Sequence, residues 1–495
     1  MKLSKMDNVK KMGKGFIKIC ESGIFVLLFV FAFNVHSEAQ DVTIKVHISG
    51  VYDSKITLLP LVGANALKPL VEKTGIKNGG ISIITVPKDR LPGAFVLRFD
   101  YKEKESSTPY PSEKYIFINN QNLELWVHPK AISTPDSTYF QKDEKENNLF
   151  VFFSTENAKR KQQIGLLQNF LMAYDKPQSN FYSNGIQEYE TRRVEYNQWV
   201  TSQMNQHKDA FISSTFAFQY VQPIDWKGKE ADRMNSLMAH YFDNMDFKDP
   251  LLVKTAELKE WMDKYVNFYG AMSTTIALRD SLFTLAGKRS IEKAKSGHPL
   301  VYGWVVDYFY KGYEGFNIPS GIKMLEPYLQ DPRCLTSKRL EIEKRLQGIE
   351  SIRPGIVAPD FLTTDKAGKA VQFLNYKMDS PYKLVLFWSA DCQHCKELME
   401  KLYPTYQQIG GKEKMEVFAL SLDFTDVEIK AWEDAKSKLV GWKHSRPKEG
   451  INSPEANAYY VLATPVMILV DSKTNKIVAL PDSAEQLEEA IKKIK

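Results

Sequence analysis

The chain has 495 residues, which is too long for one hydrophobic core, and typical domain sizes predict roughly three or four folding units. Its hydrophobic fraction, 43%, is ordinary for a globular protein. The formal net charge is +6, but six lysines face three acidic residues within the first 39 positions, so only about +3 remains on the rest. Such a small excess excludes nucleic acid as the expected partner.

The first 39 residues have the order of a signal peptide. Six lysines precede an apolar run at residues 24–33, and Ser37-Glu38-Ala39 supplies the small residues of a cleavage site. The apolar run is too short to cross a bilayer as a helix. We therefore expect cleavage before Gln40 and export to the periplasm or cell envelope, with an uncleaved anchor as the alternative.

Residues 40–130 are predicted to form a β-sandwich-like accessory domain. Apolar residues alternate with polar ones at Val42, Ile44, Val46 and Ile48, the period-two pattern of a strand with one buried face. Further strands are expected at residues 55–59, 80–86, 94–99 and 115–127, separated by Asn and Gly turn signals. No catalytic cluster is evident in this region.

Residues 145–350 are predicted to form a helical accessory domain. One apolar stripe at helical spacing consists of Leu258, Trp261, Met262, Tyr265, Val266 and Tyr269. Similar patterns recur at residues 164–172, 234–242 and 340–349. The aromatic stretch at residues 302–315 could line a binding groove, but we expect it to form core.

A Pro-Gly linker at residues 351–355 precedes a region in which strands and helices alternate. Strands are predicted at residues 383–388, 415–422, 466–471 and 477–480, and helices at residues 396–409, 426–439 and 483–493. Alternation of this kind predicts an α/β sheet covered by helices. The predicted fold class is therefore multidomain α+β, with a sandwich-like domain, a helical domain and a C-terminal α/β domain.

The chemistry is expected at Cys392-Gln393-His394-Cys395, between an apolar strand that ends at Trp388 and a helix. Unpaired N–H groups at a helix N-terminus stabilise a thiolate, so Cys392 is the predicted nucleophile. Cys395, one helical turn later, can reach the sulfur of Cys392 and resolve a mixed disulfide. A zinc knuckle would need further ligands, and no second CxxC or paired histidine follows, so no metal is expected. A structural disulfide between such close neighbours is the remaining alternative.

Residues 356–495 resemble the thioredoxin superfamily, specifically the exported TlpA/ResA-like thiol–disulfide oxidoreductases. Three segments carry the resemblance: Ala358-Pro359-Asp360-Phe361, the run from Leu384 through the CxxC to Lys396, and Tyr460-Val461-Leu462-Ala463-Thr464-Pro465 before a strand. It implies a thioredoxin-like domain that needs no cofactor and exchanges disulfides with protein dithiols and disulfides, together with a membrane or periplasmic redox partner.

The resemblance also implies roles for single residues. It makes Pro465 a cis proline lying against the CxxC, with Thr464 binding the substrate backbone, and Trp388 a supporting residue. Upstream, the β and helical regions look like accessory domains that precede thioredoxin domains in some exported bacterial proteins.

The sequence departs from the thioredoxin pattern at two positions. Leu386 stands where thioredoxin carries a buried aspartate, so the base for Cys395 is unassigned, and the early helix proline is replaced by Met399 and Glu400. The neighbouring carboxylates of Asp391 and Glu397 are expected to be solvated.

His394 and Cys334 are two further candidates. The imidazole of His394 is expected to donate to the Cys392 thiolate and to make the disulfide a better oxidant; a solvent-facing side chain without effect is the alternative. Cys334, alone in the helical region, is expected to be a buried hydrophobe.

Two other functions stay open. An exported binding or assembly protein could use the thioredoxin fold as a scaffold. A peroxiredoxin-like peroxidase would need a proline shortly before its cysteine, and residues 385–389 contain none. The substrate, the direction of electron flow and the oligomeric state are not fixed by the sequence.

Overall fold

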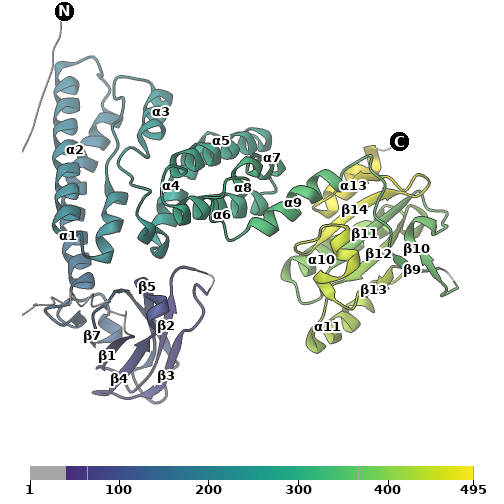
Figure 1. Cartoon of the computed structure of the whole chain (residues 1–495), viewed down its shortest axis with the longest axis horizontal. Helices are drawn as coiled ribbons and strands as arrows, with labels where there is room; N and C mark the ends of the chain where they lie inside the picture. Colours follow the sequence, from purple (N-terminus) through teal and green to yellow (C-terminus); the bar gives the residue numbers. More distant parts are fainter. Residues whose placement is uncertain (1–40, 64, 366, 494–495) are drawn as a thin grey trace, which may run out of the picture. The chain divides into compact units, whose positions relative to one another are not determined.

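The computed structural model of the protein describes residues 41–63, 65–365 and 367–493. The predicted signal peptide, residues 1–39, lies outside the described residues, as does Gln40. Along the chain, an all-β region is followed by a helical region and then by a region of mixed strands and helices (Figure 1). The helical middle and the mixed C-terminal region agree with the predicted fold class, whereas the exact domain limits stay a prediction.

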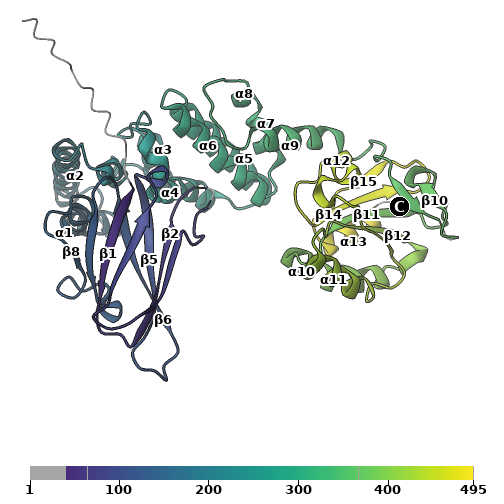
Figure 2. The same cartoon turned by 60° about the horizontal axis from the view of Figure 1, so that its bottom comes forward.

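The β region contains two four-stranded sheets, with strand orders β4-β1-β7-β8 and β3-β2-β5-β6 (Figure 2). Inward side chains of both sheets, such as Ile44 and Val46 from one and Leu97 and Phe99 from the other, share one hydrophobic core. The strands are β1 (Val42–Ile48), β2 (Asp53–Pro60), β3 (Val71–Ile76), β4 (Ile81–Val86), β5 (Gly93–Lys102), β6 (Tyr110–Ile118), β7 (Leu123–Val127) and β8 (Tyr139–Phe140).

The sequence did not predict β3 or β8, and it did not separate β6 from β7. β3 is an edge strand with four exposed residues in a row, so it lacks the alternation that marks a half-buried strand. β8 has only two residues, which is too short for any periodicity.

The helices of the middle region pack around aromatic side chains. The apolar stripe predicted for residues 258–269 lies on one helix and is largely buried. Tyr302, Phe309, Tyr310 and Tyr313 of the aromatic stretch are also buried, so they form core, as expected, and line no groove. The helices are α1 (Glu146–Ala173), α2 (Asn180–Gln206), α3 (Glu230–His240), α4 (Glu257–Met272), α5 (Ile276–Ala294), α6 (Pro299–Gly315), α7 (Pro319–Met324), α8 (Glu326–Leu329) and α9 (Arg339–Ser351).

Among the residues that the structure describes, no helix is both long enough and apolar enough to span a lipid bilayer.

The C-terminal region is built on a five-stranded sheet with the order β13-β12-β11-β14-β15. The central strand β11 pairs in parallel with β12 and antiparallel with β14. Its strands are β11 (Tyr382–Trp388), β12 (Met415–Ser421), β13 (Lys443–Ser445), β14 (Val466–Asp471) and β15 (Ile477–Ala479), and a hairpin of β9 (Leu362–Thr364) and β10 (Ala370–Gln372) precedes them. The helices are α10 (Gln393–Gln408), α11 (Asp426–Lys436), α12 (Pro454–Ala458) and α13 (Ala484–Lys493).

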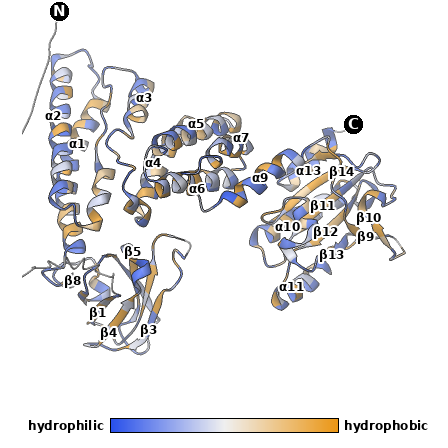
Figure 3. Cartoon of the chain, viewed as in Figure 1, coloured by the Kyte–Doolittle hydropathy of each residue, from blue (hydrophilic) through white to orange (hydrophobic). Residues whose placement is uncertain are grey.

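Both faces of this sheet are covered. Every residue of β11 is buried, because one face packs against α10, α11 and α13 and the other against the β10–β11 connection and the segment around α12. The hydropathy colouring shows the same division, with apolar residues on the central strands and hydrophilic residues on the outer turns of the helices (Figure 3). The alternation of strands and helices in the sequence predicted this layering, although it missed the short elements β9, β10, β13 and α12.

Candidate active site

The two cysteines lie where β11 passes into α10. Cys392 is the N-cap of α10, and its sulfur accepts the backbone N–H of Cys395 at 3.4 Å. The helix therefore begins at Gln393, three residues before the predicted start at Lys396, because Cys392 itself is the N-cap. Cys392 is half-buried, whereas Cys395 is 0% exposed and packs in the hydrophobic core. Only the first sulfur is accessible to a large partner.

The segment before β14 closes against Cys392. The peptide bond between Thr464 and Pro465 is cis. The thiol of Cys392 lies 3.5 Å from the backbone carbonyl oxygen of Thr464, which is 72 residues further along the chain. The structure thus brings the segment at Thr464 and Pro465 next to Cys392.

The two thiols differ in acidity. Burial alone would raise the pKa of the Cys392 thiol, but hydrogen bonds from Cys395, from the Thr464 side chain and from the backbone of His394 outweigh it, so this pKa lies below its ordinary value. Burial raises the pKa of the Cys395 thiol to about 12. Cys392 is therefore the sulfur that ionises first.

The imidazole of His394 is exposed to solvent, which is the alternative to the expected donation to the Cys392 thiolate. Its side chain is 83% exposed and its Nδ1 lies 3.8 Å from a carboxylate oxygen of Glu397. The backbone of His394, rather than its imidazole, contributes the hydrogen bond to Cys392. Asp391 and Glu397 are exposed, as expected of solvated carboxylates.

Trp388 lies on the core side of the site. It is the last residue of β11, is buried, and belongs to the same apolar cluster as Cys395. Its backbone carbonyl accepts the N–H of Leu422 at 2.8 Å, which extends the pairing of β11 with the chain that leaves β12.

A buried carboxylate that the sequence did not predict, that of Asp423, lies beside the cysteines. It accepts hydrogen bonds from the hydroxyl of Ser389 at 2.5 Å and from the N–H of Ala390 at 3.0 Å. The available signal was topological: Asp423 follows β12 as Ser389 follows β11, and the carboxyl ends of neighbouring parallel strands meet at one edge of a sheet. The loss of the aspartate at the Leu386 position therefore does not leave the site without a buried carboxylate.

No group of three or more His, Cys, Asp or Glu side chains is placed to hold a metal within the described part of the chain.

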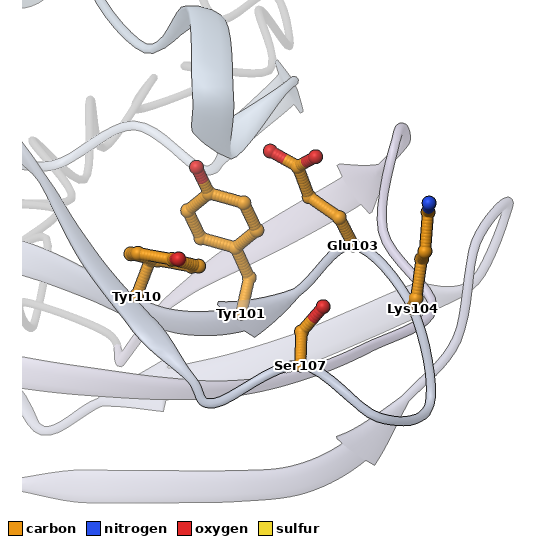
Figure 4. A pocket seen from close by; sticks show the side chains of 5 residues that line it. All are labelled: Tyr101, Glu103, Lys104, Ser107 and Tyr110. Carbon is orange, nitrogen blue, oxygen red and sulfur yellow. The ribbon is translucent and has the colours of Figure 1, made fainter.

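The β region contains a pocket lined by polar and aromatic side chains. It lies at the turn between β5 and β6 and is lined by Tyr101, Glu103, Lys104, Ser107 and Tyr110 (Figure 4). The two tyrosine rings are tilted against each other with centroids 6.3 Å apart, and Glu103 pairs with Lys130 at 2.9 Å. None of the five lining residues is a thiol or an imidazole.

Comparison with known proteins agrees with this geometry. Residues 381–477 match a family model described as thioredoxin-like. The thiol-disulfide oxidoreductase ResA of Bacillus thuringiensis subsp. konkukian is 31% identical over 150 residues, which is 29% of this chain and 80% of the relative. ResA of Bacillus anthracis is 30% identical over 151 residues, with the same coverage.

Solved structures that are similar include two from Bacteroides. The thioredoxin domain of a thiol-disulfide oxidoreductase from Bacteroides vulgatus is 27% identical and covers 29% of this chain and 98% of its own, with a TM-score of 0.24. A thioredoxin-like protein from Bacteroides caccae is 16% identical and covers 56% of this chain and 98% of its own, with a TM-score of 0.38.

A central sheet whose middle strand delivers a cysteine pair to a helix N-terminus, opposite a cis proline, defines a thioredoxin-fold domain. The chain belongs to the thioredoxin superfamily, in its TlpA/ResA-like branch. It is a thiol–disulfide oxidoreductase.

The difference between the thiols predicts selective alkylation of the reduced protein. Iodoacetamide should label Cys392, and the rate should rise with pH around a midpoint below that of an ordinary cysteine, because the thiolate is the nucleophile. Cys395 and Cys334 should stay unlabelled, since both are buried and burial raises the pKa of Cys334 to about 11.

Peptide mass mapping of the labelled protein measures all three sites, and labelling in denaturant provides the control in which each of them reacts. Faster labelling of Cys395 than of Cys392 would reverse the assigned order of the sulfurs. Rapid labelling of Cys334 would make it a third redox participant.

Proposed function

We propose that the protein exchanges disulfides with protein substrates through Cys392 and Cys395. The observation that supports this most is the unequal burial of the two sulfurs, with Cys392 at the surface of the helix N-terminus and Cys395 behind it. Such an arrangement lets the first sulfur meet a large substrate and keeps the second for the intramolecular step.

In the reductive direction, the Cys392 thiolate attacks one sulfur of a substrate disulfide. A mixed disulfide forms and the other substrate sulfur leaves as a thiolate. Cys395 then loses its proton and attacks Cys392, which releases the second substrate thiolate and leaves the Cys392–Cys395 disulfide. Two electrons pass to the substrate, and the oxidative direction is the reverse of these steps.

Thr464 and Pro465 are proposed to hold the substrate chain beside Cys392. The backbone carbonyl of Thr464 is 3.5 Å from the attacking sulfur, so a peptide bound there in extended form would present its own sulfur to Cys392. Trp388 is proposed to support the pair from the core side.

Substitution of each cysteine tests this function. Cys392→Ser should reduce insulin disulfides no faster than the uncatalysed reaction, because no nucleophile remains. Cys395→Ser should instead accumulate mixed disulfides at Cys392, detected as mass adducts that dithiothreitol removes. Cys334→Ala, which removes a buried thiol of the helical region, is the matched control and should keep the wild-type rate.

Wild-type rates in Cys392→Ser would show that another group is the nucleophile, and a wild-type protein that reduces insulin no faster than the uncatalysed reaction would favour the scaffold alternative. Consumption of hydrogen peroxide without insulin reduction would favour the peroxidase alternative.

His394 is proposed to tune the Cys392 thiolate from the first turn of α10, by hydrogen bonding and partial charge. We expect a reduction potential above the roughly −270 mV of thioredoxin, and a drop on the order of tens of millivolts in His394→Pro. Equilibration with glutathione buffers measures both. Glu397→Gln, which keeps the imidazole and changes only its 3.8 Å neighbour, should cause no drop. A potential at or below that of thioredoxin, or an unchanged value in His394→Pro, would mean that His394 does not set the potential.

The cellular setting is also a proposal. The order of lysines and apolar residues in the first 39 positions supports export to the periplasm or cell envelope, where a membrane or periplasmic redox partner would supply or accept electrons. Residues 40–130 and 145–350 are proposed to be accessory domains ahead of the catalytic domain at 356–495.

Export with cleavage predicts a mature chain that begins at Gln40. Intact-mass measurement of the protein purified from the envelope of its native host should therefore lack residues 1–39, while the same gene expressed without export should retain them. A full-length mass in the envelope fraction would indicate an uncleaved anchor instead.

A further inference from the structure

The carboxylate of Asp423 is buried beside the redox pair with neutral hydrogen-bond donors around it. The residue is 1% exposed. One oxygen, Oδ1, accepts the hydroxyl of Ser389 at 2.5 Å, the other accepts the hydroxyl of Ser421 at 2.6 Å, and the N–H of Ala390 lies 3.0–3.1 Å from both. The guanidinium of Arg446 reaches only the backbone carbonyl of Asp423, at 3.4 Å. These hydrogen bonds satisfy the carboxylate without neutralising it.

Ser389 links this carboxylate to both cysteines. Its hydroxyl donates to Asp423, its backbone N–H points at the sulfur of Cys395 at 3.5 Å, and its carbonyl accepts the N–H of Cys392 at 3.3 Å. The hydroxyl oxygen also accepts the N–H of Asp391 at 3.3 Å. Asp423 thus holds the four-residue loop from which the first cysteine projects.

We propose that Asp423 is a positioning residue of the redox site, which fixes the loop before Cys392 and shifts the dithiol–disulfide equilibrium toward the disulfide through its buried negative charge. This inference rests on the proposed function of the cysteine pair. Charge in a protein interior is little screened, so a thiolate that forms on the same buried edge is opposed. A dithiol that ionises less readily is a poorer leaving group, and its disulfide is a weaker oxidant.

Four variants of the full-length protein distinguish the effect of the Asp423 charge from the effect of the shape of its side chain. Asp423→Asn and Asp423→Ser remove the charge with different side-chain sizes, and both should move the equilibrium with glutathione toward the dithiol by about tenfold, equivalent to a potential about 30 mV higher. Asp423→Glu keeps the charge and should stay within about threefold of the wild type.

The matched control is Glu416→Gln. Glu416 is another buried carboxylate, but it lies near the amino end of β12, whereas Asp423 follows the carboxyl end, and it accepts the hydroxyl of Tyr376 at 2.8 Å. Its neutralisation should leave the glutathione equilibrium within about threefold of the wild type. Trapped-thiol mass analysis reads every equilibrium, and because two neutral variants are compared, failure of one to fold leaves the other to decide.

Three kinds of result would contradict a role for the Asp423 charge. An unchanged equilibrium in both neutral variants, a shift toward the disulfide, or an equal shift in Asp423→Glu or Glu416→Gln would overturn the inference. A wild-type protein that does not exchange with glutathione at all would refute the proposed function instead.

Discussion

The site depends on one constraint, the burial of β11 on both faces between two partner strands. Cys392 follows β11, Asp423 follows the parallel strand β12, and Thr464 precedes the antiparallel strand β14. The end of a strand, the end of its parallel neighbour and the start of its antiparallel neighbour meet at one edge of the sheet. Three segments that are distant in the sequence are therefore delivered to one place by strand pairing.

The unequal burial of the two sulfurs follows from the same geometry. Because α10 starts at the sheet edge and packs back over the sheet, its N-cap residue at that edge is only partly buried, whereas Cys395 lies inside the core. The half-buried Cys392 gains the N–H groups of the first turn, whereas Cys395 gains apolar neighbours and loses acidity. Position on the helix, rather than a separate base, distinguishes the nucleophile from the resolving thiol.

The sequence predicted what local patterns encode and missed what only tertiary structure creates. The apolar strand, the CxxC and the stripe on α4 each lie within one element, so their spacing indicated their structure. Asp423 bonds to residues 33 and 34 positions earlier, and nothing in Ser421-Leu422-Asp423 distinguishes a buried aspartate from a solvated one. The orientation of the His394 imidazole also depends on rotamer and neighbours, so residue type alone could not determine it.

The buried charged groups at the two ends of the β11–β12 pair have different kinds of partner. At the amino end, Lys383 donates to the carbonyl of Phe373 and to Asn475 at 2.8–2.9 Å, and Glu416 has the ammonium group of Lys443 at 3.9 Å. At the carboxyl end, the three donors to the Asp423 carboxylate are two hydroxyls and an amide. Burying a carboxylate without a cation costs stability even when it is fully hydrogen-bonded. Folds tolerate such a cost most readily where the charge serves the chemistry, and this charge lies at the edge that carries the cysteines.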